Sequence, residues 1–190
     1  MQIEASGRVR VHTWDELNRL PRDMWRAYLA DAETVERYHG KVYRREAGCW
    51  FWLGAISDTG HGRLRCGTRR ADPERPESHV VASHVFGYQL SRGLLRAEAG
   101  RVPLIRHKCD EASCHRPSHW VAGTPAENQA DYQARVTVAG SPLTDRRGPA
   151  RRATVIRDAI LGALADGQDV EAAIWSASAE GLPVEQAHLF

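Results

Sequence analysis

The spacing of hydrophobic and polar positions changes several times along the chain, and each change predicts a different element. Up to about residue 46 the apolar positions recur at helical spacing on both sides of Pro21, which predicts a helical segment in two pieces. Thr13 and Glu16 form a capping-box pattern at its start. The stretch CWFWLGAI then has strand-type residues, SDTGHG is rich in turn residues and RLRCG alternates, so residues 49–67 predict a β-hairpin.

The middle of the chain combines short strands with helices. HVVASHVFGYQLSRG predicts a strand that continues as a helix and ends near Gly93, while RVPLIRH and HWVAG predict two further short strands. Thr124 and Glu127 supply an N-cap and a capping-box acid around Pro125, so a helix is predicted from about 125 to about 136. Helical spacing places three polar residues on one face of it: Asn128, Asp131 and Arg135.

The C-terminal part begins with a stretch rich in Gly, Pro, Ser and Arg at residues 137–149, which predicts a linker. Two helical stripes follow it, separated by ADGQD. Such a helix pair suits a DNA-reading helix-turn-helix, a dimerisation hairpin or a packing extension, and we favour the packing extension. The predicted organisation is an N-terminal helical segment (1–46), a central unit (47–137) and a linker with a helical hairpin (138–190), which together make an α+β protein.

Composition narrows the class of protein. With 190 residues and 42% hydrophobic residues, the chain can form a substantial core. No apolar run approaches the roughly 20 residues that span a bilayer, and the first residues lack the apolar region of a secretion signal, so we expect a cytoplasmic protein without a membrane partner. The net charge is only +2, but 24 of the 26 basic residues are arginine, whose planar guanidinium matches phosphate oxygens. Arginines cluster at residues 63–75 and 146–152, as on a nucleic-acid-binding surface.

Four cysteines in a reducing compartment are better explained as metal ligands or buried thiols than as disulfides. Cys109, Cys114 and His119 lie close together along one loop and can supply three ligands of a tetrahedral zinc ion. Cys49 and Cys66 are the candidates for the fourth ligand. The loop CDEASC buries almost no apolar surface, so it needs such a metal to become ordered, and we predict a structural zinc site.

Two polar residues beside this loop remain unclaimed by the zinc. His107 ends a predicted strand and Asn128 lies in the first turn of the following helix, so the two side chains can face each other across a groove. A neutral histidine can take a proton from water, and an asparagine oxygen is a suitable ligand for magnesium, which binds phosphate oxygens. The pair therefore predicts hydrolysis of a phosphodiester. Cys66 and His84 are interpreted as core residues.

The stretch from His107 to Asn128 resembles the His-Cys box group of HNH endonucleases, also called ββα-metal or His-Me finger nucleases. Their hallmark reads roughly H-x-C-D-N-P-x-C-x-N-P-x-H-L followed by G-T-x-x-x-N, and this chain matches the spacing of its His, Cys and Asn positions. GCWFWLGA with GHG, and SHVFGYQLSRG, are similar to the segments that precede this hallmark in bacterial and phage members. The resemblance covers residues 47–136.

The resemblance implies a ββα-metal finger with a zinc-stapled loop. It implies His107 as general base, Asn128 as the magnesium ligand, and a structural zinc held by Cys49, Cys109, Cys114 and His119. It also implies a basic residue that holds the scissile phosphate, for which the candidates are Arg65, Arg69, Arg70 and His79. Glu111 departs from the hallmark Asn, Trp120 from Leu and Val85 from Arg. Arg106 stands where many HNH enzymes have a carboxylate, which favours a site with one magnesium ion.

The expected function is a metal-dependent endonuclease that cuts double-stranded DNA to 5′-phosphate and 3′-hydroxyl ends, in a restriction, homing or phage role. Cutting both strands would suit a homodimer. Two alternatives remain open: a zinc-stabilised DNA-binding module without catalysis, and a nuclease that cuts RNA.

Overall fold

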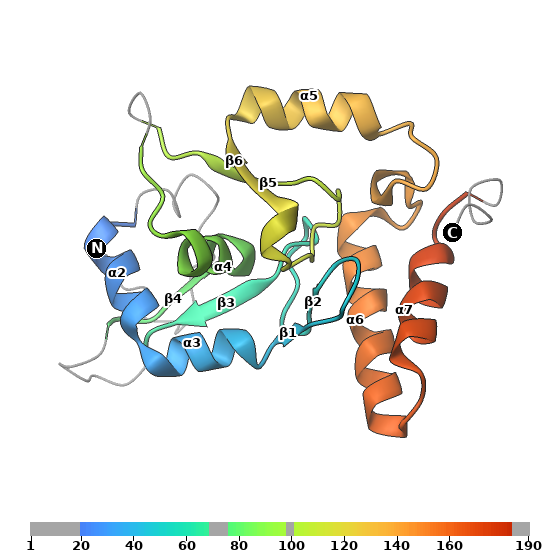
Figure 1. Ribbon diagram of the computed structural model, residues 1–190, viewed down its shortest axis with the longest axis horizontal. Helices are drawn as coiled ribbons and strands as arrows, with labels where there is room; N and C mark the ends of the chain where they lie inside the picture. Colours follow the sequence, from blue (N-terminus) through green and yellow to red (C-terminus); the bar gives the residue numbers. More distant parts are fainter. Residues whose placement is uncertain (1–19, 69–75, 98–100, 184–190) are drawn as a thin grey trace, which may run out of the picture.

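The computed structural model describes residues 20–68, 76–97 and 101–183, which contain six α-helices and three small antiparallel sheets (Figure 1). This mixture confirms the expected α+β content. The capping-box pattern at Thr13 and Glu16 lies outside the described residues, as do Arg69 and Arg70. No helix in the described part of the chain is both long and apolar enough to cross a bilayer.

The described part of the N-terminal segment is helical, as predicted, but its two short helices both follow Pro21 and are divided at Asp31; the predicted piece before Pro21 lies outside the described residues. Helix α2 (Arg22–Ala30) starts directly after Pro21. Proline is tolerated at a helix start because the backbone N–H groups there have no partner within the helix. Helix α3 (Ala32–His39) follows after one residue and buries Tyr38. Residues 42–43 of the predicted helical segment are instead strand β1 (Val42–Tyr43).

The prediction that residues 49–67 form a β-hairpin is wrong, because the two strands of this segment pair with other strands. Strand β2 (Phe51–Trp52) pairs with β1, and strand β3 (Arg63–Cys66) pairs with β4 (His79–Ala82). Only an isolated bridge between Ile56 and Gly62 joins the two halves of the predicted hairpin. The physical reason is that the backbone of β2 also bonds to the cysteine loop. The Trp52 amide donates to the Ser113 carbonyl at 3.1 Å, and Phe51 forms a β-bridge with Cys114.

The elements after β4 follow the sequence prediction closely. Helix α4 (Ser83–Arg92) continues directly from β4 and ends at Gly93, which has a φ of 86°. Strands β5 (Leu104–His107) and β6 (Trp120–Gly123) form an antiparallel pair, with the cysteine loop and a short helix η1 (Pro117–His119) between them. Helix α5 (Pro125–Arg135) then begins with the predicted capping box, in which the Thr124 and Glu127 side chains each bond the other residue's backbone N–H.

The predicted linker is more ordered than its composition indicates. It contains a short helix η2 (Pro142–Thr144), and both Ser141 and Asp145 are buried. Helices α6 (Gly148–Asp166) and α7 (Val170–Ala179) follow and pack side by side, which confirms the predicted helical hairpin. They stand at the opposite end of the molecule from α2 in Figure 1.

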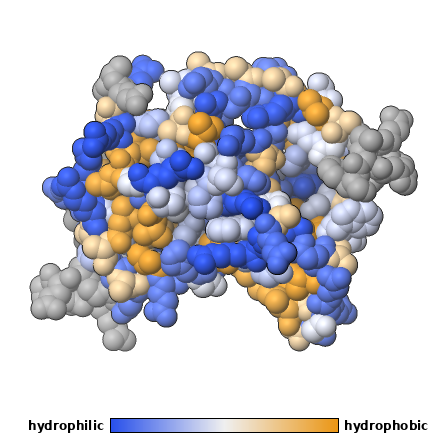
Figure 2. All heavy atoms as spheres, viewed as in Figure 1, coloured by the Kyte–Doolittle hydropathy of each residue, from blue (hydrophilic) through white to orange (hydrophobic). Residues whose placement is uncertain are grey.

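Two hydrophobic clusters hold the described chain together. The first joins the N-terminal helices, β3, β4, α4 and the β5–β6 pair, and includes Trp52 and Trp120. The second is formed by residues of α6 and α7 packed around Phe51 of β2. The helical hairpin therefore packs onto the central unit, as the packing interpretation expects. Part of the hairpin stays exposed: Figure 2 shows hydrophobic atoms gathered on the lower part of these helices, where Leu161 and Leu164 are exposed.

Candidate functional site

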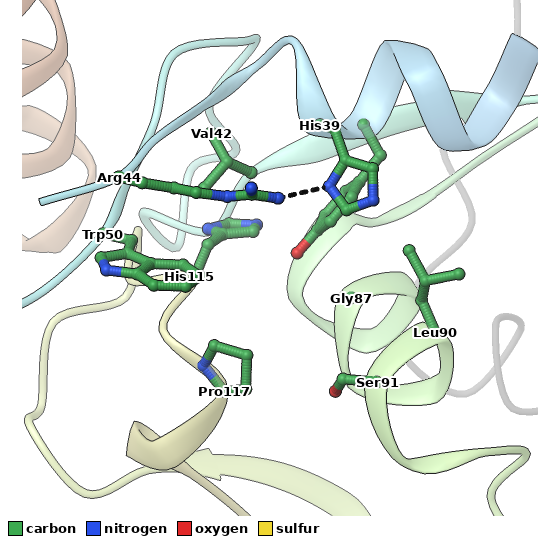
Figure 3. A pocket seen from close by; sticks show the side chains of 10 residues that line it. His39, Val42, Arg44, Trp50, Gly87, Leu90, Ser91, His115 and Pro117 are labelled. Atoms are coloured by element: carbon green, nitrogen blue, oxygen red, sulfur yellow. Dashed lines mark hydrogen bonds between the residues drawn. The ribbon is translucent and has the colours of Figure 1, made fainter.

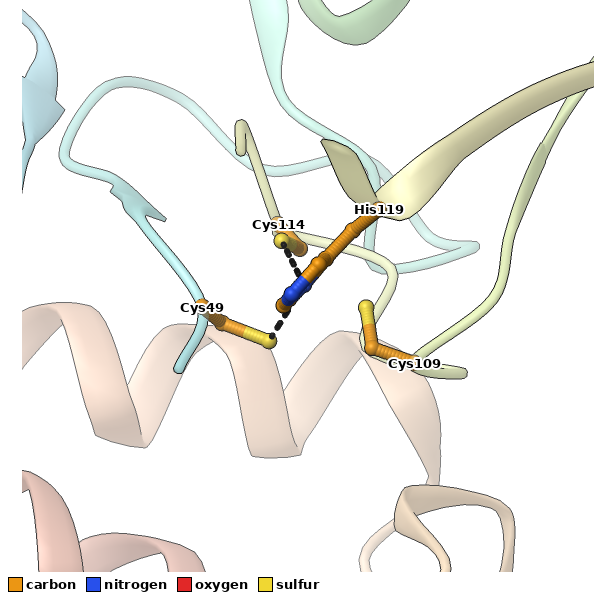
Figure 4. A group of neighbouring side chains, drawn as sticks. All are labelled: Cys49, Cys109, Cys114 and His119. Carbon is orange, nitrogen blue, oxygen red and sulfur yellow. Dashed lines mark hydrogen bonds between the residues drawn. The ribbon is translucent and has the colours of Figure 1, made fainter. Parts of the chain in front are cut away.

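Three cysteines and one histidine converge beside strand β2. Their side chains point toward one another from Cys49, just before β2, from Cys109 and Cys114 in the loop after β5, and from His119 at the end of η1 (Figure 4). The potential ligand atoms of all four residues lie within 4.8 Å of one another. This group could hold a metal ion, and the predicted choice of Cys49 over Cys66 as the fourth member of the group is confirmed. Cys66 is fully buried in the first hydrophobic cluster, as predicted.

The donor set fits zinc in both chemistry and spacing. Three sulfurs and one imidazole nitrogen are ligands that zinc prefers, in a number that completes a tetrahedron. With Zn–S and Zn–N bonds of about 2.3 Å and about 2.0–2.1 Å, tetrahedral geometry separates sulfur from nitrogen by about 3.6 Å. The His119 Nδ1 lies 3.6 Å from the Cys49 Sγ and 3.5 Å from the Cys114 Sγ. Both of these distances match tetrahedral coordination of a zinc ion.

The three thiols strongly perturb one another. The hydrogen bond with Cys114, followed by that with Cys49, lowers the pKa of Cys109 to about 2, whereas the hydrogen bond with Cys109 raises the pKa of Cys49 far above its ordinary value. One thiolate thus forms easily, and the others then keep their protons because the charges repel. All three can ionise together only if a cation offsets their charge, which zinc would do.

Hydrogen bonds to backbone carbonyls fasten the cysteine loop to the segment before β2 that carries Cys49. The His115 amide donates to the Trp50 carbonyl at 2.7 Å, and the Arg116 guanidinium donates to the Gly48 carbonyl at 2.8 Å. The loop also contains Asp110, a non-glycine residue with a φ of 57°. Its carboxylate lies 3.1 Å from the Arg135 guanidinium of α5, which offsets part of the cost of this conformation.

His107 is held by the same loop. Its Nε2 lies 3.1 Å from the Cys114 carbonyl oxygen, and the Trp120 Nε1 lies 3.1 Å from that oxygen and 3.2 Å from the His107 Nε2. The indole nitrogen can only donate. If it donated to His107, the histidine would carry no proton on Nε2 and would face the carbonyl oxygen as a second acceptor. We therefore assign the proton to Nε2, so that both N–H groups donate to the carbonyl and Nδ1 keeps its lone pair.

Two further histidines surround His107. The ring of His84 lies 5.1 Å from that of His107, and the ring of His61 lies 5.6 Å away. Burial lowers the pKa of His107, and burial followed by the charge of His107 lowers the pKa of His61 to about 3. All three rings are therefore neutral near pH 7, as a proton acceptor must be. His84 is buried as predicted, but its Nδ1 has no hydrogen-bond partner among the described residues.

His61 is a neighbour of His107 that the sequence analysis did not single out. The only sequence feature that pointed to His61 was the GHG triplet, in which glycines flank the histidine, within the segment that resembles HNH proteins. Gly62 lies against the Trp52 ring and the Ser83 hydroxyl, so a side chain at position 62 would clash. The glycine lets the chain pass close to the first cluster and brings His61 toward His84.

Asn128 lies on the exposed first turn of α5. Within the described residues its side chain makes no hydrogen bond, so the amide oxygen is open to a ligand. Helix α5 is fixed to β5 by Arg106, whose guanidinium lies 2.6 Å from the Asp131 carboxylate and 3.6 Å from that of Glu127. Asp131 is thereby engaged in an ion pair. The facing of Asn128 toward His107 stays a prediction.

Two of the candidates for the phosphate-binding residue, Arg65 and His79, lie on the paired strands β3 and β4. Arg65 on β3 donates to the Ser78 hydroxyl at 3.0 Å, and His79 on β4 is hydrogen-bonded to the Tyr28 hydroxyl. The ring neighbours of His107 are His61 and His84 instead. The role of all four candidates, including Arg69 and Arg70 outside the described residues, stays a prediction.

Comparison with known proteins adds nothing to this picture: no family model, curated protein or solved structure matched the chain. The function is therefore inferred from the geometry of His107 and of the four residues that could hold a metal ion.

Proposed function

We propose that this protein is a metal-dependent DNA endonuclease of the ββα-metal (His-Me finger) type. The supporting observation is the position of His107, which is the last residue of β5 and is bonded through Nε2 to the carbonyl of a potential zinc ligand. The element order β5, metal-binding loop, β6, α5 is the one that the resemblance to HNH endonucleases implies.

In this proposal the zinc site is structural. Cys49, Cys109, Cys114 and His119 would hold the ion, which would fix the loop and with it the Cys114 carbonyl. That carbonyl orients the imidazole and fixes its tautomer, a role often played by a hydrogen-bonded neighbour of a catalytic histidine. The zinc would then act on the reaction only through the orientation of His107.

The chain's own groups would carry the hydrolytic step. The Nδ1 of His107 accepts a proton from a water molecule as the water oxygen attacks a DNA phosphorus. The Asn128 amide oxygen would hold magnesium, and an ion bound there supplies positive charge against the developing negative charge on the phosphate. The bond to the 3′ oxygen breaks, which leaves a 5′-phosphate and, after protonation, a 3′-hydroxyl.

Cleavage of supercoiled plasmid DNA tests this proposal. The wild-type protein should nick or linearise the plasmid with magnesium present and leave it intact without magnesium. His107→Ala and Asn128→Ala should each lower the rate about 10²-fold or more, because each removes a group needed in the transition state. Gln129→Ala, which changes the exposed residue next to Asn128, should keep the wild-type rate.

Three outcomes would contradict the proposal. If both variants kept their activity, His107 and Asn128 would have no catalytic role. If the protein shifted DNA in a gel but never cut it, the protein would be a zinc-stabilised binding module. If the protein degraded RNA and spared duplex DNA, the proposed substrate class would be wrong.

A further inference from the structure

A cavity of about 250 Å³ lies beside the cysteine loop, which contributes His115 to its lining. It opens between the end of α3, β1, the residue before β2 and one side of α4, with His115 of the loop in its wall (Figure 3). The volume is below the roughly 300–1,000 Å³ of pockets for drug-sized ligands, so it suits one small ring system. His115 directly follows Cys114, whose carbonyl holds His107.

One wall of the cavity is an aromatic ring stacked with a guanidinium. The Arg44 Cζ lies 5.4 Å from the centre of the Trp50 ring, and an Arg44 nitrogen lies 2.8 Å from the His39 Nδ1. The Trp50 Nε1 donates to the Arg45 carbonyl at 2.9 Å, which fixes the indole plane. The wall is therefore a rigid, flat surface of the kind on which planar rings stack.

The Tyr38 hydroxyl provides a polar group in the lining of the cavity. Tyr38 is only 5% exposed, lines the cavity, and its hydroxyl forms no hydrogen bond with a described residue. The hydroxyl lies over Gly87 of α4, where any Cβ would clash with it. Burial raises the pKa of Tyr38, so the hydroxyl keeps its proton and can both donate and accept. Because no described residue occupies this hydroxyl, it is available to a ligand that enters the cavity.

The charge around the cavity is positive. Arg44 is in its wall, Arg116 lies 6.0 Å from the Trp50 ring centre, and Arg92 donates to the carbonyl of Pro117, a lining residue. Arg92 and Arg116 are bonded to backbone carbonyls, which leave their charge uncompensated. None of the described residues that line the cavity is acidic. A cationic ligand or a metal ion is therefore disfavoured, and a ring attached to phosphate is favoured.

We infer that this cavity binds one unstacked nucleobase of a DNA strand. The base would stack against the Trp50 side of the cavity and pair an edge with the Tyr38 hydroxyl, while Arg44, Arg92 and Arg116 contact the flanking phosphates. Bases removed from a duplex stack in this way on aromatic and guanidinium planes. The inference rests on the proposed function for its substrate, because the loop that lines the cavity also holds His107.

Fluorescence anisotropy with two labelled probes tests this inference without magnesium, so that no probe is cut. One probe is a 12-nucleotide single DNA strand, and the other is an abasic strand of the same length, with the same phosphates. The wild-type protein should bind the base-bearing strand at least about fivefold more tightly, the lower end of one stacking interaction. Ser91→Tyr, which fills the cavity from an exposed position of α4, should abolish this preference, and Ser91→Ala should preserve it.

Tyr38→Phe is the second variant, because it removes only the unpaired hydroxyl. It should leave the thermal unfolding temperature unchanged or higher and reduce the preference for bases. The inference is overturned if the wild type shows no preference, or if the preference survives in both Tyr38→Phe and Ser91→Tyr. A preference that depends on these residues in a protein that cuts no plasmid would contradict the proposed nuclease and support the base site. Plasmid cleavage together with a preference unaffected by either substitution would support the proposed nuclease and contradict the base site.

Discussion

At the scale of single residues, the four cysteines have two different fates. Cys49, Cys109 and Cys114 face His119 across a distance that fits one metal ion, whereas Cys66 is fully buried among hydrophobic side chains. Burial raises the pKa of the Cys66 thiol, as expected for a cysteine that only fills a core. The thiols of the group instead crowd one another and need a cation to ionise together.

Metal analysis of cysteine variants follows from this difference. Protein purified with zinc should contain about one equivalent of the metal, because the group supplies a single set of four ligands. Cys109→Ser should lose most of this zinc, and Cys66→Ala should retain it. Elemental analysis after gel filtration gives the measurement. Equal zinc in both variants would show that the ion, if any, is held elsewhere.

Spacing along the chain predicts three of the ligands but cannot choose the fourth. Cys109, Cys114 and His119 lie within eleven consecutive residues, so their proximity is a local property of the loop. The choice between Cys49 and Cys66 depends on which strand the loop contacts, and the family resemblance supplied it. No sequence pattern indicated that the Tyr38 hydroxyl lacks a hydrogen-bond partner, because this depends on the packing of α3 against α4.

At the scale of elements, a buried ionic network joins the metal-binding loop to helix α6. The Arg152 guanidinium of α6 donates to the Glu111 carboxylate at 2.8 Å and to the Asp145 carboxylate at 3.0 Å, and all three side chains are buried. The Arg147 guanidinium also lies 2.7 Å from the Asp145 carboxylate. Glu111 is a position where this chain departs from the HNH hallmark that it resembles, and the buried ion pair with Arg152 gives the carboxylate a structural role there.

Replacing Arg152 by alanine should therefore destabilise the protein by about 3–5 kcal/mol, because Glu111 would be left buried without its partner. Arg151→Ala, a change at the exposed neighbouring position, should alter the free energy of unfolding by less than about 0.5 kcal/mol. Urea denaturation followed by circular dichroism measures both. Equal effects of the two substitutions would mean that the buried network contributes nothing specific.

Elements with local signals are predicted better than those that depend on distant partners. The start of α5 follows from Thr124, Pro125 and Glu127, and α4 ends at the predicted glycine. The pairing of β2 was mispredicted because strand partners are chosen by the whole fold: β1 and the metal-binding loop occupy β2, and β3 pairs with β4 instead.

At the scale of the whole molecule, the metal-binding loop lies where the two hydrophobic clusters meet. Trp120 after the loop belongs to the first cluster, and Phe51, which forms a bridge with Cys114, belongs to the second. Ordering of the loop by zinc would therefore strengthen the contact between the two halves of the core. The same loop holds His107 through the Cys114 carbonyl and contributes His115 to the lining of the cavity beside Trp50.

In the proposed function the His107 Nδ1 is the general base, and chemical rescue by imidazole tests this role. Single-turnover nicking of plasmid DNA would be measured for His107→Gly with magnesium, with and without added imidazole. The account predicts a loss of about 10²- to 10⁴-fold and a partial recovery that rises with imidazole concentration. A His107→Gly protein that cuts as fast as the wild type would contradict it.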